Sequence, residues 1–256
     1  MAMNILVVGG GGREHAIVWK LQQSPLAGII FTAPGNPGMR NVTRIPMGSP
    51  AELAEFAATN QIGLTMVGPE APLCDGIVDE FRRRGLRIFG PTQAAAQLEG
   101  SKAFAKRFMV AHGIPTAASE TFTDAESAIA YIRTMGAPIV VKADGLAAGK
   151  GVIVAMTEQE AVDGVRLCFS GAFGAAGATV LVEEFLQGEE ASILAFADGT
   201  TIVPLASSQD HKRIGDGDTG PNTGGMGAYS PAPVVTDAVW KQIQEQVLDR
   251  FLEGCR

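Results

Sequence analysis

The stretch 138–152 combines two cations with a run of glycines. Lys142 ends a β-branched run at 139–141, and a second β-branched run resumes at 152–154; between them lie Gly145, Gly149, Lys150 and Gly151. Glycines let backbone N–H groups turn toward a phosphate, and lysine ammonium groups neutralise its charge. The pattern predicts a β-hairpin whose tip folds over a phosphate. An ordinary glycine hairpin with two solvated lysines is the alternative.

This glycine loop is not a P-loop. A P-loop reads G-x-x-x-x-G-K-[ST] and leads into a helix. Here Asp144 stands where the first glycine belongs, Gly151 replaces the Ser or Thr, and the following residues are typical of a strand. We therefore expect a different phosphate-binding device.

Charged residues also gather in the stretch 208–227. Asp210, His211, Lys212 and Arg213 are consecutive, and six glycines lie between 215 and 227. Long irregular loops in compact domains are usually functional or disordered. The cluster of charges beside a predicted strand end favours a substrate loop over a linker.

A third candidate is the glycine run 9–12, which follows the buried strand predicted at 4–8 and precedes a helix. The dinucleotide fingerprint G-x-G-x-x-G fails, because Glu14 or His15 occupies its sixth position, depending on the starting glycine. A helix N-terminus preceded by glycines still attracts phosphate. The sequence favours a phosphate or phosphosugar over NAD, with a tight turn that binds nothing as the alternative.

The elements around this run predict an open α/β sheet. Apolar runs at 28–33, 64–67 and 86–89 are typical of strands, each ending in a Gly/Pro loop, and helices are expected at 51–58 and 75–84. Ligands bind such sheets outside the carboxyl ends of the strands. Residues 9–15, 34–38 and 68–73 should therefore line one crevice.

The second half of the chain mixes helices with antiparallel strands. We expect a helix that begins at residue 101, further helices at 124–135, 158–168 and 236–252, and a strand at 180–186. Residues 192–197 and 201–206 should pair as a hairpin across Asp198-Gly199, and 171–177 should be a mobile loop of small residues. The fold class is thus α/β, with a doubly wound parallel sheet first and an α+β part after it.

Composition limits the function classes. Apolar residues make up 46% of the chain and charged residues 18%, as in globular proteins, and the net charge of −7 argues against a nucleic-acid binder. The three cysteines are scattered, which suggests reduced thiols in the cytoplasm. No apolar run approaches the roughly 18 residues of a membrane span.

Seven segments in register resemble the phosphoribosylamine–glycine ligases, or glycinamide ribonucleotide synthetases. They are Gly-Gly-Arg-Glu-His-Ala at 11–16, Ala-Pro-Gly-Asn at 33–36, Val-Gly-Pro-Glu-Ala-Pro-Leu at 67–73, Leu-Glu-Gly-Ser-Lys at 98–102, Lys-Ala-Asp-Gly-Leu-Ala-Ala-Gly-Lys-Gly-Val at 142–152, Glu-Glu-Phe-Leu at 183–186 with 188–192, and 208–213 through 220–227. The resemblance covers the larger, N-terminal part of the family's length.

The resemblance implies an ATP-grasp ligase of purine biosynthesis that uses ATP and Mg²⁺. ATP would phosphorylate the carboxylate of glycine, and the amine of 5-phosphoribosylamine would attack the glycyl phosphate. It implies a phosphoribosylamine-binding domain at 1–100, a partial ATP-grasp core at 101–118 and 189–256, and a lid subdomain at 119–188.

The resemblance also implies roles for individual residues. The catalytic residues would be Lys142, Asp210 and Lys212. ATP would be bound by Lys102, Lys142, Gly145, Gly149, Lys150, Gly151, Glu183, Glu184, Phe185, Leu186 and Glu190. The other substrates would be bound by Gly11, Gly12, Arg13, Gly35, Asn36, Gly68, Pro69, Glu70, Asp210, Pro221, Asn222, Thr223 and Gly224.

One departure concerns the metal. The family carries a Glu-x-Asn pair for magnesium on a later strand, and no such strand is found after Asp237. We therefore expect either a piece of a longer enzyme or an inactive chain, with exposed apolar surface that favours association, whereas the full enzyme should be a monomer. A phosphosugar-binding module without catalysis and an NAD-dependent oxidoreductase are the competing hypotheses.

Overall fold

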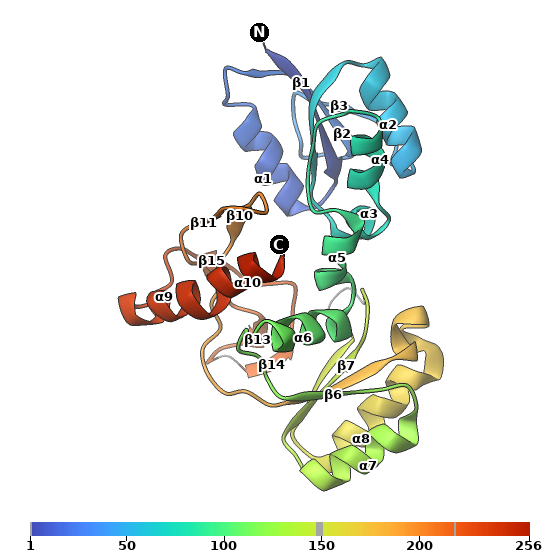
Figure 1. Cartoon of the computed structure of the whole chain (residues 1–256), viewed down its shortest axis with the longest axis vertical. Helices are drawn as coiled ribbons and strands as arrows, with labels where there is room; N and C mark the ends of the chain where they lie inside the picture. The colour runs from blue at the N-terminus through green and yellow to red at the C-terminus, as the bar shows by residue number, and fades with distance from the viewer. Residues whose placement is uncertain (1, 147–150, 218) are drawn as a thin grey trace. The chain divides into compact units, whose positions relative to one another are not determined.

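The computed structural model describes residues 2–146, 151–217 and 219–256. The chain divides into two compact units, Met1–Gly100 and Ser101–Arg256 (Figure 1). Both units mix helices with strands, so the predicted α/β class is confirmed. Within the described ranges, no helix is long and apolar enough to cross a membrane.

The first unit is built on a five-stranded parallel sheet of order β3-β2-β1-β4-β5. Its strands are β1 (Met3–Gly9), β2 (Ala27–Pro34), β3 (Thr43–Arg44), β4 (Ile62–Val67) and β5 (Ile88–Phe89). Leu6, Val7 and Val8 of the central strand are fully buried, because helices cover both faces of a doubly wound sheet. The two-residue strand β3 has too short an apolar pattern to be predicted, and β5 begins two residues later than expected.

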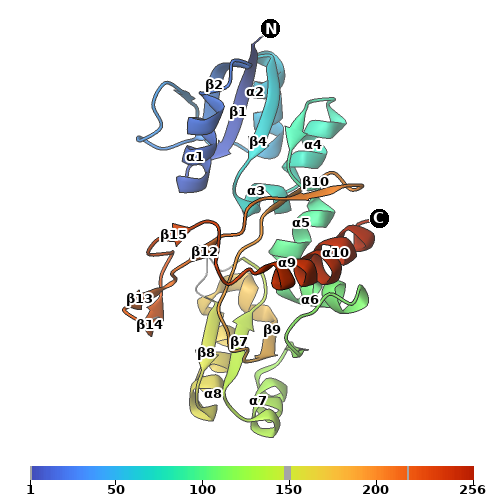
Figure 2. The ribbon, with the colours of Figure 1, turned by 90° about the vertical axis from the view of Figure 1, so that its left-hand side faces the viewer.

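Helices flank this sheet on two sides (Figures 1 and 2). Helix α1 (Gly12–Leu21) contributes Val18 to a core with Ile5 and Val7. The opposite core holds Leu6 and Val8 together with side chains of α2 (Pro50–Thr59) and α4 (Ile77–Arg83). Two further helices are α3 (Glu70–Cys74) and α5 (Gln93–Gly100).

The helix predicted at 75–84 is confirmed as α4, which begins two residues later than expected, whereas the short helix α3 before it was not predicted. Helices α3 and α4 are separated by a turn in which Gly76 has a φ of +81°. This left-handed backbone conformation interrupts the helical hydrogen bonds and favours glycine. An isolated glycine within an apolar pattern was therefore the signal for two helices.

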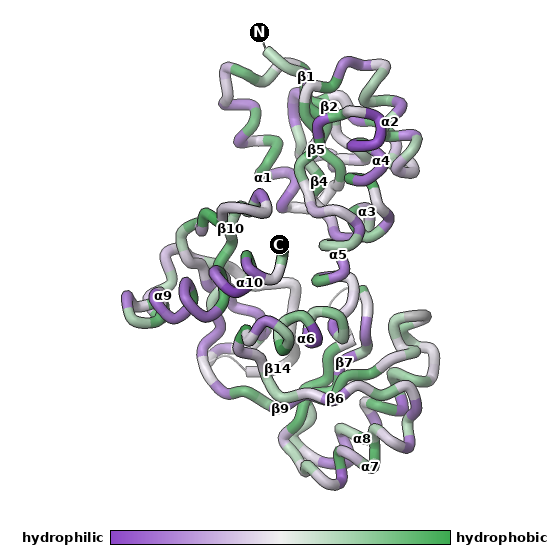
Figure 3. The backbone as a smooth tube through the Cα atoms, in the orientation of Figure 1, coloured by the Kyte–Doolittle hydropathy of each residue, from purple (hydrophilic) through white to green (hydrophobic). Residues whose placement is uncertain are grey.

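The second unit contains a four-stranded antiparallel sheet of order β6-β9-β7-β8. Its strands are β6 (Ser119–Phe122), β9 (Val180–Glu184), β7 (Ile139–Ala143) and β8 (Val152–Ala155). Apolar residues of α7 (Ala125–Met135) and α8 (Glu158–Leu167) pack on its inner face with Val141 and Val182. Strand β7 is accordingly coloured as apolar in Figure 3, and the predicted hairpin of β7 and β8 is confirmed.

Shorter elements complete this unit. They are α6 (Lys102–Ala111), η1 (Cys168–Ala172), η2 (Gly174–Ala178), β10 (Ala195–Ala197), β11 (Ile202–Pro204), β12 (Gln209–Asp210), β13 (Arg213–Gly215), β14 (Thr219–Asn222), β15 (Ala228–Tyr229), α9 (Asp237–Ile243), η3 (Gln244–Leu248) and α10 (Asp249–Gly254). The hairpin of β10 and β11 is confirmed.

Two of the predicted loops are more regular than expected. The stretch 171–177 is not an open loop, because it forms the helical turns η1 and η2. The stretch 208–227 contains paired strands, β12 with β15 and β13 with β14. Pairs only two to four residues long leave no alternating pattern in the sequence.

Candidate functional site

A carboxylate between two lysines lies in the second unit. Glu183 of β9 is 5% exposed, and one of its oxygens, Oε2, accepts a hydrogen bond of 2.7 Å from Nζ of Lys142 on β7. Nζ of Lys106 on α6 lies 3.6 Å from the same oxygen. The backbone positions this cluster because Glu183 stands in register with Val140, on the strand beside Lys142. Sequence reasoning identified Lys142 and Glu183 but gave no role to Lys106.

The start of the glycine loop, just after β7, contacts the N-terminus of α6. Nζ of Lys102 donates a 2.7 Å hydrogen bond to the carbonyl of Gly145. Asp144 accepts hydrogen bonds from the Ser101 hydroxyl, at 3.0 Å, and from the backbone N–H of Ala103, at 3.1 Å. The predicted lysine and the first loop glycine are therefore in contact, and Asp144, which was not singled out, joins them to the helix.

The far end of the loop returns to β7. The carbonyl of Gly151 accepts a hydrogen bond of 2.8 Å from the N–H of Ala143. The predicted phosphate ligands Gly149 and Lys150 lie outside the described residues.

The stretch after β9 holds the residues expected to bind the nucleoside. Glu184 ends the strand, and its carboxylate accepts a 3.2 Å hydrogen bond from the N–H of Ala118. Phe185 and Leu186 follow outside the strand, and Leu186 is exposed. The carboxylate of Glu190, expected to hold ribose hydroxyls, instead forms an ion pair with Lys212. The hydrogen bond to Glu190 raises the pKa of Lys212 above 10.5, although burial opposes that shift.

Lys212 also connects to the glycine-rich stretch through its backbone. Its carbonyl accepts hydrogen bonds from the N–H of Thr223, at 2.6 Å, and from the Thr223 hydroxyl, at 2.9 Å. Half-buried Asp210 lies on β12, two residues before Lys212. Pro221 and Asn222 belong to β14, and Gly224 follows Thr223. The structure thus brings Lys212 together with Glu190 and Thr223.

In the first unit, three loops meet at the carboxyl ends of β1, β2 and β4. The Asn36 side chain donates a 3.0 Å hydrogen bond to the carbonyl of Gly10, and the N–H of Gly35 donates to the carbonyl of Gly9 at 3.1 Å. The N–H of Gly68 donates a 3.0 Å hydrogen bond to the carbonyl of Val8. These contacts follow from the parallel order of the strands, which places their carboxyl ends at one edge.

Glu14 is the residue of these loops that sequence reasoning left without a role. It is 3% exposed; its Oε2 accepts a 2.7 Å hydrogen bond from the N–H of Gly11, and its Oε1 lies 3.2 Å from Nε of Arg13. Arg13 also forms a 3.0 Å ion pair with Glu70, the residue that follows Pro69. Because a carboxylate already occupies the N–H of Gly11, that group is not available to a ligand phosphate.

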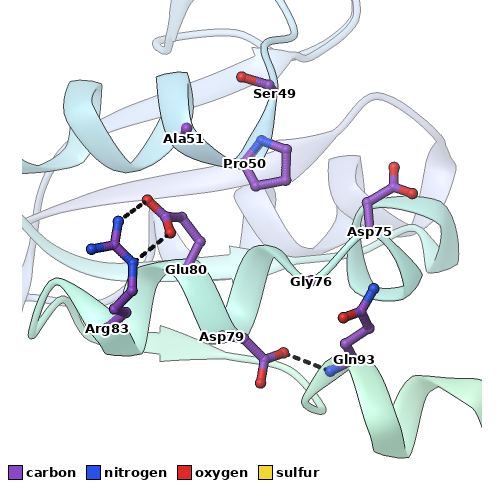
Figure 4. Close-up of a pocket in the computed structure, with 9 residues that line it drawn as sticks. All are labelled: Ser49, Pro50, Ala51, Asp75, Gly76, Asp79, Glu80, Arg83 and Gln93. Carbon is purple, nitrogen blue, oxygen red and sulfur yellow. Dashed lines mark hydrogen bonds and ion pairs between the residues drawn. The ribbon is translucent and has the colours of Figure 1, made fainter.

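A cavity of about 430 Å³ opens elsewhere in the first unit, between α2 and the start of α4 (Figure 4). It is lined by Ser49, Pro50, Ala51, Asp75, Gly76, Asp79, Glu80, Arg83 and Gln93. Three of its charged side chains have partners, since Glu80 pairs with Arg83 and the Asp79 carboxylate accepts a 2.7 Å hydrogen bond from the N–H of Gln93. The cavity shares no residue with the three loops, and its carboxylates suit a phosphate poorly.

The described residues contain no group of three or more His, Cys, Asp or Glu side chains that could hold a metal ion. Lysine ammonium groups can neutralise phosphate charge, and Lys102 and Lys142 are the lysines that lie beside the glycine loop.

The chain is an ATP-grasp protein, because residues 100–256 match the model of an ATP-grasp domain, and its lysine-bearing helix α6 contacts the segment between the antiparallel strands β7 and β8. The biotin carboxylase domain of the Hydrogenobacter thermophilus 2-oxoglutarate carboxylase shares the fold, with a TM-score of 0.78 at 16% identity over all of this chain and 59% of that chain. Two family models match in succession: "Phosphoribosylglycinamide synthetase, N domain" over residues 3–99 and "Phosphoribosylglycinamide synthetase, ATP-grasp (A) domain" over 100–256. The chain belongs to the phosphoribosylglycinamide synthetase family.

Named relatives agree with this membership. The phosphoribosylamine–glycine ligases of Yersinia pestis and Haemophilus influenzae are 62% and 60% identical over 98% of this chain. The crystal structure of the Thermotoga maritima phosphoribosylamine–glycine ligase is 35% identical, has a TM-score of 0.81, and is matched over 98% of this chain and 61% of its own. The chain spans 60% of the length of the two curated relatives.

Proposed function

We propose that this chain supplies the nucleotide-binding and phosphoribosylamine-binding parts of a phosphoribosylamine–glycine ligase. ATP phosphorylates the carboxylate of glycine, and the amine of 5-phosphoribosylamine then displaces phosphate to form the amide. The observation that carries the proposal is the contact between Lys102, at the start of α6, and Gly145, the first glycine of the loop that follows Lys142 on β7. Both fall within a region that matches the family's ATP-grasp domain.

The residues of the second unit suit the phosphoryl-transfer step. Such transfer depends mainly on positioning and on stabilising charge. Lys102 and Lys142 neutralise the phosphates of ATP, and the loop that starts at Gly145 covers them and excludes water. The backbone of 183–186 reads the adenine edge, and Glu190 accepts ribose hydroxyls. Magnesium, when bound, would neutralise further phosphate charge.

The remaining substrates are assigned to two places. Asp210 accepts the ammonium group of glycine, and Lys212 stabilises the transferred phosphate, assisted by the backbone at 221–224. Phosphoribosylamine binds at the three loops of the first unit. Its phosphate is assigned to Arg13 and Gly12, since the N–H of Gly11 is occupied by Glu14, while Asn36 and Glu70 contact its ribose. The reaction uses small molecules of the cytoplasm and requires neither nucleic acid nor membrane.

Substitution of Lys142 tests the nucleotide assignment. Removing a charge-assisted contact to phosphate with Lys142→Met should weaken ATP binding, measured by calorimetry, by about tenfold or more. The matched control is Lys20→Met, because Lys20 is exposed in the last turn of α1 and its loss should leave the affinity unchanged. Equal affinity of the Lys142 variant and the unmodified chain would contradict the assignment.

A second measurement tests the reaction. ADP release with ATP, glycine and freshly made phosphoribosylamine should depend on all three compounds. If the chain binds ATP but releases no ADP under these conditions, it is a nucleotide- and phosphosugar-binding module without catalysis.

A further inference from the structure

Lys106 is a largely buried lysine whose ammonium group is fully engaged. Its side chain is 12% exposed, compared with 27% for Lys142. Nζ of Lys106 donates hydrogen bonds of 2.7 Å to the Thr116 hydroxyl and 2.8 Å to the carbonyl of Ala117. Two neutral acceptors thus hold the charge in place beside Glu183, and no substrate contact is needed to keep it there.

Glu183 is shared unequally between the two lysines. Its Oε2 lies 2.7 Å from Nζ of Lys142 and 3.6 Å from Nζ of Lys106. The three groups together carry one net positive charge. Lys142 is the more exposed of the two lysines, and in the proposed function it binds a nucleotide phosphate.

We propose that Lys106 is a positioning residue that keeps Glu183 neutralised, so that Lys142 can leave the carboxylate and bind a nucleotide phosphate. This inference deepens the proposed function and rests on it. Lys106 itself touches neither nucleotide nor reacting atoms in this scheme.

The physical reason is the cost of a buried charge without a partner. A carboxylate as buried as Glu183 is costly once its only counter-ion leaves. With Lys106 fixed nearby, an ammonium group remains beside Glu183 after Lys142 has moved. Burial lowers the pKa of Lys106 from its usual 10.5, and Lys142 lowers it further, while Glu183 acts in the opposite direction. The departure of Lys142 would therefore also relieve the repulsion between the two lysines.

Acetylation of Lys142 by acetic anhydride, measured by mass spectrometry, tests this role in the nucleotide-free chain. In Lys106→Met, Glu183 has only Lys142 as its partner, so Lys142 should be held more tightly and be acetylated about tenfold more slowly. Adding Glu183→Gln removes the charge that Lys106 neutralises. The Lys106→Met/Glu183→Gln chain should then be acetylated at the rate of Glu183→Gln alone.

Acetylation of Lys142 in the presence of ATP tests whether Lys106 allows Lys142 to bind a nucleotide phosphate. ATP should protect Lys142, and half-protection should need about tenfold more ATP in Lys106→Met than in the unmodified chain. In the double variant, half-protection of Lys142 should need as much ATP as in Glu183→Gln alone. Lys106→Arg keeps the charge and should restore most of the ATP affinity.

Two outcomes would overturn the inference. One is an unchanged Lys142 acetylation rate in Lys106→Met. The other is a slow rate that persists in the double variant, because a merely structural role of Lys106 would not be relieved by neutralising Glu183. If Lys106→Met does not fold, Lys106→Gln is measured in its place. Failure of the proposed function looks different: ATP would not protect Lys142 in the unmodified chain, whereas the nucleotide-free rates would still decide the role of Lys106.

Discussion

Individual residues differ in how far their roles can be read from the sequence. Lys142 stands out because it ends a strand and precedes a glycine loop, a pattern that suits phosphate, whereas Lys102 received its role only from the family resemblance. Glu14 and Lys106 do not stand out, since their importance lies in burial and in partners distant in the chain. One signal was available for Lys106: it follows Lys102 by four residues, and such residues share a helix face.

Gly68 illustrates a residue type that is fixed by a neighbouring side chain. A Cβ at this position would lie 2.0 Å from Oε1 and 2.5 Å from Cδ of Glu14. Because Glu14 is buried and held by Gly11 and Arg13, it cannot move aside cheaply. Position 68 therefore requires glycine because the Glu14 carboxylate occupies the space of a Cβ atom, and not because the backbone there has a positive φ.

We predict that Gly68→Ala lowers the free energy of unfolding of the first unit by ~3 kcal/mol through overpacking. The control is Gly12→Ala, where an added Cβ meets nothing within 4 Å, and where a small gain of ~0.5 kcal/mol is expected. Urea unfolding followed by Trp19 fluorescence in a Trp240→Phe background measures both. Equal stability of the two variants would show that Glu14 can move to accommodate the added methyl group.

At the scale of elements, the sequence predicts long and periodic segments well. The apolar runs predicted β1, β7 and β8, and the helix expected at 124–135 is present as α7. The strand β3, the paired strands within 208–227 and the short helix α3 were missed, because elements of two to five residues are too short to show a periodic pattern. The order of strands in either sheet depends on contacts between distant segments, which one sequence does not display.

Helix α6 depends on an N-terminal contact that comes from another element. Asp144, at the end of β7, bonds to the Ser101 hydroxyl and to the N–H of Ala103. We predict that Asp144→Ala lowers the free energy of unfolding of the second unit by ~2 kcal/mol, because it leaves these helix-end donors without a partner. Urea unfolding reported by Trp240 in a Trp19→Phe background measures it.

The matched comparison is Asp124→Ala, which removes an N-cap that bonds to Ser127 within its own helix. Its expected cost is ~1 kcal/mol. Asp144→Ala combined with Ser101→Ala should cost less than the sum of the two single changes, because both remove the same contact. Additive costs would mean that Ser101 and Asp144 act independently.

The end of α4 provides a test of pH dependence. Hydrogen bonds from Arg83 and Arg84 lower the pKa of Glu80 from 4.5 to about 2. Since the folded chain holds Glu80 ionised, the stabilisation should be complete above pH 4.5 and should be lost as the pH falls toward 2. The stability difference between the unmodified chain and Glu80→Gln, from urea unfolding at a series of pH values, should therefore be constant above pH 5 (roughly) and shrink below it. A difference that does not change down to pH 3 (roughly) would contradict the shifted pKa.

At the scale of the whole chain, family membership and the α/β class could be inferred from motif order, and both are confirmed. Motif order could not show which polar groups are already paired. The ion pair of Glu190 with Lys212 links a residue assigned to ribose with one assigned to the transferred phosphate. Each of these two residues therefore already has a charged partner within the chain.

One face of the hairpin formed by β10 and β11 is apolar and exposed. Phe196 stands opposite Val203, and the N–H of Leu205 bonds to the carbonyl of Leu194. Side chains directly opposite each other, and those two residues apart, share one face of a strand pair. All four lie on that face with exposed fractions of 43% to 55%, and Figure 3 colours β10 as apolar.

We predict that this face drives self-association of the chain, because contiguous apolar surface is stabilised when it is removed from water. In sedimentation velocity experiments, the average mass should rise above that of the monomer as concentration increases. Leu194→Lys with Leu205→Lys places two like charges opposite each other and should keep the chain monomeric at the same concentrations. Val110→Lys is the control, because Val110 is 70% exposed on α6 and lies outside the hairpin. Association that persists in the double variant, or that Val110→Lys abolishes equally, would assign the contact to another surface.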